Sequence, residues 1–461
     1  MDFLKKSFAK NAQSPFLIGN INVTYEQFHQ NIVKNIPLKE KNLALVSVSE
    51  GFDALSIYLA CQLQSVVPIM LPEQLNENEL NRYIKKYKPD YIFTKNNFKK
   101  IDMYSIKDQS SLRNDFFLYE SNSSKKHNIK NTALLLSTSG STGDPKLVKL
   151  TENNIETNTN AIVGSLNLRE EDTTAISLPL NYSFGLSVIH SHILAGTKII
   201  ITDPSILSKS FWEDISKYDI RCLYGVPYQF EIFKKFKVFS KLPKRFRFFA
   251  QAGGAMDASL TKWFLDQSIE NKRDIYIMYG QTECSPRISS FNITKNPNKI
   301  GSAGKAIENC NVFLDSNSSE GELLIRGKNV FSGYAQSIDE LYSEKVSNKT
   351  HHSGDIGFID EDGFIFITGR AKRFVKVYGH NINLDHLESN LKSVYTEIAI
   401  VGRDNHITVF HTGDDRNGEL LNAEIENIKT VNTRAIKVKK IGNIPRLSNE
   451  KVDYQKLEIY L

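Results

Sequence analysis

The most constraining feature of this sequence is a stretch in which an apolar run breaks into hydroxyl side chains, glycines and a lysine, at residues 134–146. The apolar run, which starts at Leu134, predicts a buried strand, and the polar residues after it predict a loop that binds phosphate. Gly140 and Gly143 allow backbone N–H groups to approach a polyphosphate without a Cβ atom in the way, and Lys146 adds a positive charge. The hydroxyl donors of this loop are Ser137, Thr138, Ser139, Ser141 and Thr142.

This loop differs from a Walker loop, because its hydroxyls precede the lysine and no Gly-Lys-Ser/Thr occurs at the required spacing. A flexible surface turn is the alternative interpretation, since short runs of glycine and serine are common in loops. The motifs farther along the chain favour phosphate binding.

Length, charge and cysteine content narrow the class of protein. The 461 residues are enough for two or more domains, and the net charge of +6 is spread along the whole chain. Its small basic clusters are typical of solvated faces, so we expect no nucleic-acid partner. The four cysteines are isolated and match neither a metal site nor a disulfide framework. No apolar run has the length of a membrane span or a signal peptide, so we expect a cytoplasmic protein.

Short apolar runs alternate with amphipathic segments on both sides of the loop. Strands are expected at residues 43–48, 66–70, 91–94, 132–136, 198–202, 221–224, 246–250 and 274–279. Helices are expected at residues 52–62, 77–87, 153–166, 229–236 and 257–267. This alternation predicts parallel sheets with helices on both faces, and ligands bind at the strand ends of such sheets. From residue 301 to 369, shorter strands and turns predict hairpins or a barrel.

Three later segments carry polar side chains suited to nucleotide chemistry. They are Tyr279-Gly-Gln-Thr-Glu283; His352-Ser-Gly-Asp-Ile-Gly357 with Gly369-Arg370; and the segment 444–453, which contains Lys451. In this order, and together with residues 137–149, they resemble the adenylate-forming synthetases. That family includes acyl-CoA synthetases, the adenylation domains of peptide synthetases, and luciferases. The resemblance covers nearly the whole chain.

The resemblance implies roles for the residues after two of the predicted strands. The Tyr279 ring would lie on adenine, Thr282 would meet phosphate, and Glu283 would hold magnesium. One carboxylate is sufficient there, because magnesium prefers few carboxylates together with phosphate oxygens. Gly253 and Gly254 would let the backbone lie flat against the nucleotide.

Three further residues acquire roles by the same resemblance. Asp355 would accept hydrogen bonds from both ribose hydroxyls, and Arg370 would contact ribose and phosphate. Lys451 resembles the lysine of adenylation. Its ammonium group would lie between the attacking carboxylate and the α-phosphate, which lowers the barrier raised by their mutual repulsion.

The resemblance also implies an architecture. We expect an α/β fold in which residues 1–371 form a large N-terminal ATP- and acid-binding domain. This domain would hold two α/β sandwich subdomains and a small β-barrel-like subdomain. Residues 372–461 would form a small, mobile α+β lid domain that carries the adenylation lysine, with Lys372 as the hinge between two arrangements.

The acid-binding residues are expected at residues 181–186. Relatives that activate amino acids place an aspartate there, and its absence argues against an α-amino acid. Tyr182 and Gly185 resemble the pattern of acyl-activating relatives, whereas Asn181 resembles that of relatives that activate aryl acids. The predicted substrate is a small carboxylic acid without an α-amino group.

The predicted activity is that of an ATP-dependent, magnesium-dependent acid ligase. It would form an acyl-adenylate and pyrophosphate, then transfer the acyl group to the thiol of CoA or of a carrier protein's phosphopantetheine. An amine or hydroxyl acceptor is one alternative. A non-catalytic nucleotide-binding protein on the same fold is another, although mere binding requires neither Glu283 nor Lys451.

Overall fold

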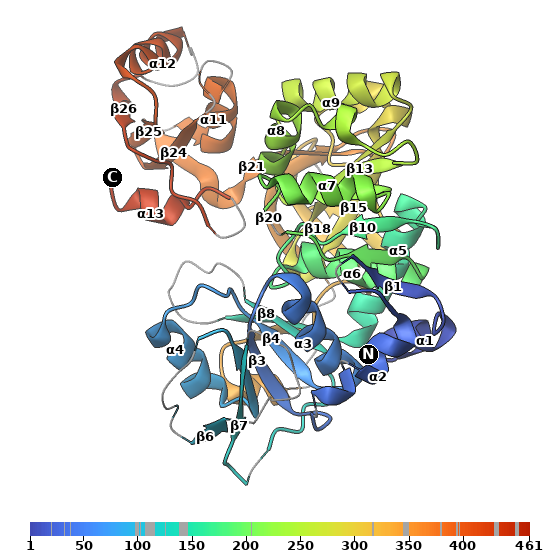
Figure 1. The fold of residues 1–461 in the computed structure, drawn as a ribbon. Helices are drawn as coiled ribbons and strands as arrows, with labels where there is room; N and C mark the ends of the chain where they lie inside the picture. Colours follow the sequence, from blue (N-terminus) through green and yellow to red (C-terminus); the bar gives the residue numbers. More distant parts are fainter. Residues whose placement is uncertain are drawn as a thin grey trace. The chain divides into compact units, whose positions relative to one another are not determined.

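A computed structural model describes residues 1–19, 21–31, 33–36, 38–96, 101, 103–106, 116–124, 126–137, 146–203, 205–315, 318–343, 350–378, 380–392, 395, 397–427, 433–447 and 451–461. The chain divides into two compact units (Figure 1). The first unit contains Met1–Ile300, Gly304–Asn311 and Arg326–His351, and the second contains Gly301–Ala303, Val312–Ile325 and His352–Leu461.

An eight-stranded sheet of the first unit carries the start of the predicted phosphate loop. Its order is β19-β9-β8-β4-β3-β5-β7-β6, and the inner strands β8, β4, β3 and β5 are parallel. The strand bounds are β3 (Leu43–Ser47), β4 (Val67–Met70), β5 (Tyr91–Thr94), β6 (Tyr104–Ile106), β7 (Phe117–Ser121), β8 (Leu134–Ser137), β9 (Leu147–Leu150) and β19 (Gly333–Ala335).

Helices complete the layers of this sheet. Helix α4 (Glu77–Tyr87) begins with a capping box at Asn76 and packs Leu80 and Ile84 against alternate residues of β3 and β4. Helix α3 (Gly51–Leu63) also packs against these two strands, and α10 (Ile338–Tyr342) packs against β19. The spacing of the apolar residues therefore predicted α4 correctly, because residues three and four apart share one helix face.

A nine-stranded sheet of the first unit has the order β16-β15-β14-β13-β12-β10-β11-β1-β2. Strands β14, β13, β12, β10, β11 and β1 are parallel, and the outer strands β16, β15 and β2 are antiparallel. The strand bounds are β1 (Pro15–Ile18), β2 (Val23–Thr24), β10 (Thr173–Ala175), β11 (Lys198–Ile200), β12 (Cys222–Gly225), β13 (Phe248–Gln251), β14 (Asp274–Gly280), β15 (Arg287–Asn292) and β16 (Lys305–Ala306).

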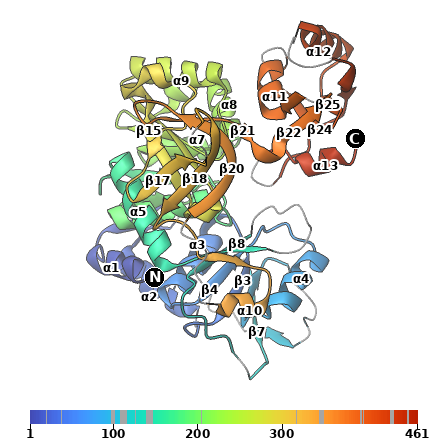
Figure 2. The same ribbon diagram turned by 180° about the vertical axis from the view of Figure 1, so that it is seen from behind.

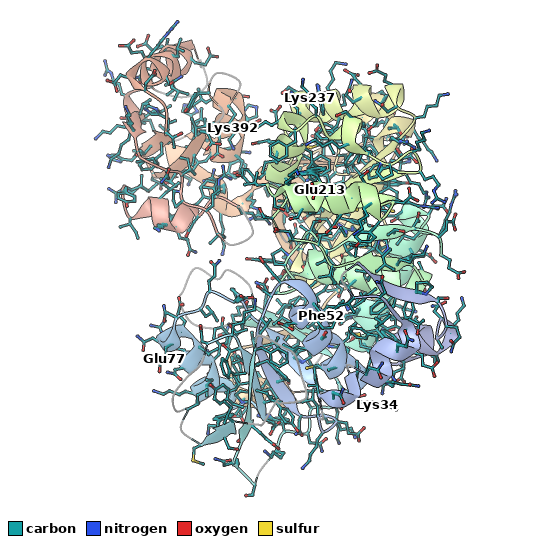
Figure 3. All side chains as sticks on the ribbon, in the orientation of Figure 1. Lys34, Phe52, Glu77, Glu213, Lys237 and Lys392 are labelled. Carbon is teal, nitrogen blue, oxygen red and sulfur yellow. The ribbon has the colours of Figure 1, made fainter. Side chains whose placement is uncertain are left out.

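The two faces of this sheet bury different side chains. On one face, Tyr224 and Phe248 join the apolar cluster that includes residues of α5 (Glu152–Leu166) and α6 (Ser183–Ala195). On the other face, the Phe249 ring lies 6.0 Å from Phe230 of α8 (Pro227–Lys235) and 5.6 Å from Phe264 of α9 (Ala258–Glu270). Successive side chains of a strand point to opposite faces, which explains the alternation. The remaining helices of this unit are α1 (Asp2–Lys10), α2 (Tyr25–Asn31) and α7 (Lys209–Lys217), and the exposed Glu213 side chain of α7 is labelled in Figure 3.

A four-stranded sheet, β17-β18-β20-β21, corresponds to the predicted barrel-like subdomain. Figure 2 shows β17 (Cys310–Leu314), β18 (Gly321–Gly327) and β20 (Thr350–Ile359) side by side, and β21 (Ile365–Arg370) pairs with β20.

The C-terminal part of the second unit has its own small core. Strands β24 (Ile398–Arg403), β25 (His406–His411) and β26 (Ile436–Lys440) form a sheet, and β22 (Phe374–Val377) pairs with β23 (His380–Asn383). Helices α11 (Leu384–Lys392) and α12 (Asp415–Asn427) contribute to the cluster on one face of the three-stranded sheet, and α13 (Tyr454–Glu458) contributes to the cluster on the other. On α11, Lys392, labelled in Figure 3, forms an ion pair of 2.8 Å with Glu388.

The predicted α/β fold is confirmed. The predicted domain boundary at Lys372 stays a prediction, because the compact units are defined by contacts and group the four-stranded sheet with the C-terminal residues. Within the described ranges, no helix is both long enough and apolar enough to cross a membrane. Cys61, Cys222, Cys284 and Cys310 are buried and form no disulfide.

Candidate active site

The base of the predicted phosphate loop is held by two antiparallel strands. Ser137 ends β8 and pairs in register with Leu147, the first residue of β9, and Lys146 lies directly before β9. The Ser137 side chain also forms a hydrogen bond with Tyr83 of α4. The two ends of the loop therefore lie side by side. The predicted loop residues that lie outside the described part of the chain are Thr138, Ser139, Gly140, Ser141, Thr142 and Gly143.

A tyrosine that the sequence did not mark joins two of the predicted site residues. The Lys146 Nζ lies 3.4 Å from the centre of the Tyr334 ring, and Tyr334 Oη donates a hydrogen bond of 2.9 Å to Glu283 Oε1. Burial is the main cause that raises the pKa of Tyr334, and the adjacent Glu283 raises it further, so the hydroxyl stays protonated and donates. Tyr334 belongs to β19, which pairs with β9 and so reaches the lysine from a distant part of the sequence.

The predicted adenine and phosphate residues lie in the turn after β14. Tyr279 is near the end of this strand, and Gln281 Nε2 donates to its hydroxyl over 3.3 Å. Gln281 Oε1 lies 2.9 Å from His351 Nε2, in β20. The hydroxyl of Thr282 lies 3.3 Å from that of Ser183, at the start of α6. The turn is thus connected both to His351 and to α6.

The two predicted glycines come after the neighbouring strand, β13. Gly253 has a φ of +87°, and a Cβ atom there would lie 3.0 Å from Val226 Cγ1. The carbonyl of Gly254 accepts a hydrogen bond of 2.8 Å from Gln251 Nε2, which fixes the turn. Because β13 and β14 are parallel neighbours, these glycines and the Tyr279 turn lie at the same edge of the sheet, the edge at which such sheets bind ligands.

The predicted acid-binding residues surround the N-terminus of α6. Asn181 is buried, Tyr182 is the N-cap residue, and Gly185 lies in the first turn. A Cβ atom at Gly185 would lie 2.4 Å from the Pro179 carbonyl oxygen, so the close approach requires glycine. Gly185 and Tyr224 line a cavity of about 10 Å³, which is the space of about one water molecule.

Three predicted residues come together in the second unit. Asp355 of β20 and Arg370 of β21 are partners in register, and the Arg370 Nε lies 3.1 Å from Asp355 Oδ1. Asp355 is buried and Arg370 is exposed. The charges of both act on Lys451: desolvation lowers the pKa of Lys451, Arg370 lowers it further, and Asp355 raises it. Backbone hydrogen bonds of 2.8 Å, from Leu447 N to Lys451 O and from Asp453 N to Pro445 O, hold the segment that carries the lysine.

The predicted hinge residue differs sharply from its neighbour. Lys372 is an exposed residue in the 3-10 helix Ala371–Arg373. Arg373 forms ion pairs with Asp385 (2.8 Å) and Glu388 (3.1 Å), and its guanidinium lies over the Tyr454 ring. The Arg373 side chain is thus anchored to α11, and the Arg370 N–H also donates to Asp385, whereas the side chain of Lys372 between them is exposed.

The donor set around Glu283 suits magnesium held mainly by phosphate. In the described part of the chain, no group of three or more histidine, cysteine, aspartate or glutamate side chains could hold a metal. Glu283 offers a carboxylate, one oxygen of which accepts from Tyr334, the residue whose ring lies under Lys146. Magnesium bound by one carboxylate and several phosphate oxygens fits this arrangement.

The fold and these residues define a nucleotide-binding α/β enzyme, and a family model identifies it further. The model described as "AMP-binding enzyme" matches residues 5–335. The chain therefore belongs to the AMP-binding enzyme family, which confirms the predicted membership of the adenylate-forming synthetases.

Individual relatives agree with the family. A 2-succinylbenzoate–CoA ligase of Bacillus cereus is 25% identical over 424 residues, which cover 87% of this chain and 84% of the relative. The o-succinylbenzoate CoA synthetase of Bacillus subtilis, in complex with its acyl-adenylate, has a TM-score of 0.80 at 19% identity and covers 99% of this chain and 97% of its own. An anthranilate CoA ligase with anthranoyl-AMP has a TM-score of 0.77 at 16% identity, covering 100% of this chain and 96% of its own. These relatives are named as CoA ligases or synthetases, which agrees with the predicted class of enzyme, an AMP-forming acid–thiol ligase. The synthetase from Bacillus subtilis was also solved with ATP and magnesium ion.

Proposed function

We propose that this chain is an ATP-dependent acid–CoA ligase. In the first step, a carboxylate oxygen of the acid attacks the α-phosphorus of ATP, and pyrophosphate leaves. In the second, the CoA thiolate attacks the carbonyl carbon of the acyl-adenylate, a thioester forms, and AMP leaves. Both steps depend on positioning and charge neutralisation and need no protein nucleophile.

The observation that carries this proposal is the grouping of Lys451 with Asp355 and Arg370. Binding of a nucleotide alone requires an acceptor for ribose and a contact to phosphate, and Asp355 and Arg370 would supply them. It does not require, beside them, a lysine ammonium group whose pKa is lowered. Such a group is suited to the negative charge that develops as a carboxylate approaches a phosphate.

The first unit would supply the remaining contacts to Mg-ATP. Lys146 would contact phosphate, Glu283 would hold magnesium, and Thr282 would donate to phosphate. Tyr279 would lie on the adenine, with the backbone of Gly253 and Gly254 beside it. This assignment is supported by Tyr334, which contacts both residues: its ring lies under Lys146 and its hydroxyl donates to Glu283.

We infer an acid without an α-amino group, bound near Asn181, Tyr182 and Gly185. No aspartate lies between residues 181 and 186 to pair with a substrate ammonium. The acceptor that we infer is CoA, since the relatives at about a quarter identity are named as CoA ligases. A carrier protein's phosphopantetheine would serve in the same chemical way and is the second outcome to test.

Two further predictions belong to this proposal. We propose that residues 1–371 and 372–461 act as separate domains, with Lys372 as a hinge; its exposed position beside the anchored Arg373 supports this. We also propose a cytoplasmic location, supported by the four buried cysteines, which form no disulfide.

The test is pyrophosphate release from Mg-ATP with a panel of short, long and aromatic acids and of amino acids, each with and without CoA. Replacing Lys451 with alanine should lower adenylation about 100- to 1,000-fold, as does the loss of one group that stabilises transition-state charge. Binding of ATP should change little. Lys456→Ala, at an exposed lysine of the same terminal region, is the matched control and should release pyrophosphate at the normal rate.

Each outcome has a defined meaning. Pyrophosphate release with one acid class, and a further rise with CoA, would support the proposal. If release rose only with a pantetheinylated carrier protein, that carrier would be the acceptor in place of CoA. Adenylation by Lys451→Ala at the normal rate would contradict the role of this lysine. ATP binding without release for any acid or acceptor would favour a non-catalytic protein.

A further inference from the structure

Arg287 is a buried arginine whose backbone is held from two sides. It is the first residue of β15, and only 2% of its surface is exposed. Its N–H donates to Asn158 Oδ1 of α5 over 3.1 Å, and its carbonyl accepts from Asn329 Nδ2 over 3.0 Å. These contacts fix where the side chain starts, beside the end of β14, where Arg287 is the register partner of Gly280.

The guanidinium group of Arg287 has no acidic partner. Within the described residues, no carboxylate lies within ion-pair distance of it, and its Nε has no hydrogen-bond partner. Its neighbour is an aromatic ring, that of Phe184, 5.1 Å from the guanidinium carbon. Burial lowers the pKa of Arg287 to about 10, so the group is still charged at neutral pH. A buried charge without a partner is strongly unfavourable, which makes its presence here unusual.

A second source of positive potential lies at the same place. Helix α6 has 13 residues, its N-cap Tyr182 makes no side-chain hydrogen bond to it, and its first turn has no acidic residue. The N-terminus of such a helix attracts anions, because its N–H groups and dipole are positive there. Phe184 lies in this first turn, and Gly185 and Tyr224 line the small cavity beside it.

The positions of the nucleotide turn and of Arg287 along α6 would orient a bound acid. The nucleotide turn meets the start of α6 at the contact of 3.3 Å between the hydroxyls of Thr282 and Ser183. Under the proposed function, the reacting carboxylate of the acid must reach that turn. Arg287 contacts the next residue of α6, Phe184, and its charge acts on Tyr224 in the interior of the sheet. A group that met Arg287 would therefore belong to the other end of the acid.

We propose, resting on the ligase function above, that Arg287 binds a second anionic group of the substrate, which is a dicarboxylic acid. The guanidinium would form two parallel hydrogen bonds with the distal carboxylate, and the N-terminus of α6 would add to the attraction. Because the Phe184 ring lies against the guanidinium, this side chain would rotate to admit the acid. Arg287 is thus a specificity-determining residue, and binding of the acid supplies the counter-charge that the protein lacks.

The test uses acids of equal chain length with one or two carboxylates, such as hexanoate against adipate and benzoate against phthalate. Pyrophosphate release is measured for the full-length wild type, Arg287→Met and Arg287→Lys. For wild type, we expect a lower KM for the dicarboxylic member of one pair. In Arg287→Met, its KM should rise about 10- to 100-fold, as expected for loss of a charge-assisted hydrogen-bonded pair, and that of the monocarboxylic member should change less than threefold. Arg287→Lys should recover part of the preference, since it restores the charge without the planar fork.

A matched control separates recognition from folding. Arg247→Met removes another arginine of the same sheet, one that is paired with Asp172, and should leave the preference between the two acids unchanged. Equal loss with both members of a pair in Arg287→Met, or a wild type that prefers monocarboxylic acids throughout, would overturn the proposal.

Failure of the proposed function would show itself differently. If wild type released no pyrophosphate with any acid, direct binding would decide the matter, measured as the shift in melting temperature caused by each acid. A shift with a dicarboxylate that Arg287→Met abolishes would support the anion site without the ligase reaction. No shift, or the same shift in both proteins, would overturn the anion site as well.

Discussion

An arginine lies at each of two opposite edges of the nine-stranded sheet, and the two differ in whether a carboxylate pairs with them. At the edge where the parallel strands begin, Arg247 precedes β13 and forms an ion pair with Asp172, whose side chain is fully buried. At the edge where they end, Arg287 lies beside Gly280 and has no carboxylate partner among the described residues. The first edge neutralises its charge within the fold, and the second leaves a charge for a ligand. Ligands of parallel sheets bind at the second edge, which agrees with this difference.

The second unit contains the same contrast. Arg373 is neutralised by Asp385 and Glu388 within the C-terminal core. The pKa of Lys451, in contrast, is lowered, because desolvation and the charge of Arg370 outweigh the attraction of Asp355. Arg247 and Arg373 thus have carboxylate partners within the fold, whereas Arg287 and Lys451, which we assign to substrate and to chemistry, lie in less favourable surroundings.

The strongest test of this contrast compares Arg247→Met with Arg287→Met in the absence of ligand. Removing Arg247 leaves the Asp172 carboxylate buried without its partner, so unfolding free energy should fall by about 3–5 kcal/mol. Removing Arg287 takes away a charge that has no acidic partner, and stability should stay the same or rise. Urea denaturation of both variants measures the difference. If the two variants lost similar stability, the distinction between the edges would be wrong.

Lys146 is an intermediate case, because its neighbour is a tyrosine that in turn binds a carboxylate. Tyr334→Phe keeps the ring beneath Lys146 and removes the hydrogen bond to Glu283, a bond to a charged group that contributes about 1.5–3 kcal/mol. We expect the KM for Mg-ATP to rise about 10- to 100-fold, with the larger rise at low magnesium concentration. Tyr334→Leu removes both contacts and should raise it further. Steady-state kinetics at several magnesium concentrations would check this, and an unchanged KM in both variants would exclude a positioning role for Tyr334.

The smallest effect is expected in the pH dependence of adenylation. Lys451 must be protonated to neutralise charge, and its pKa lies below the ordinary value of 10.5. Activity should therefore fall as pH rises through the lowered pKa, earlier than for an ordinary lysine. Because the unfolded chain binds this proton more tightly than the folded one, the contribution of Lys451 to stability should become more favourable as pH rises. Single-turnover pyrophosphate release from pH 7 upward measures the activity, and Lys451→Arg, which keeps its proton, should flatten the decline at high pH.

Local sequence patterns predicted most of the secondary structure in this fold. The helix at residues 77–87 and the strand at 91–94 have the predicted bounds, because a capping box, helical spacing and a nearby proline act on neighbouring residues. The N-terminal helix Asp2–Lys10 was not predicted, and the stretch that interrupts the pattern after Pro179 leads into a helix at Ser183. That helix is buried all round from Gly185 to Ile193, so its sequence lacks the periodicity that marks a surface helix.

The residues of the candidate site also fall into two groups, those that sequence motifs predicted and those that only the structure brought to light. Lys146, Glu283, Asp355, Arg370 and Lys451 stand in short motifs, where residue type and spacing already express the chemistry. Tyr334 and Arg287 stand in no such motif. Their significance depends on what a distant strand or helix brings beside them.

The sequence alone therefore determined the alternation of strands and helices and the family, and it supplied the proposed nucleotide-binding residues, since each depends on neighbours along the chain. Only the tertiary structure decided which charges have partners. Asp172 reaches Arg247 across 75 positions of sequence, and Arg287 is enclosed by α5, α6 and the sheet without any acid among the described residues. The energy of a charge depends on all the groups near it in space, and the order of residues along the chain does not specify which groups those are.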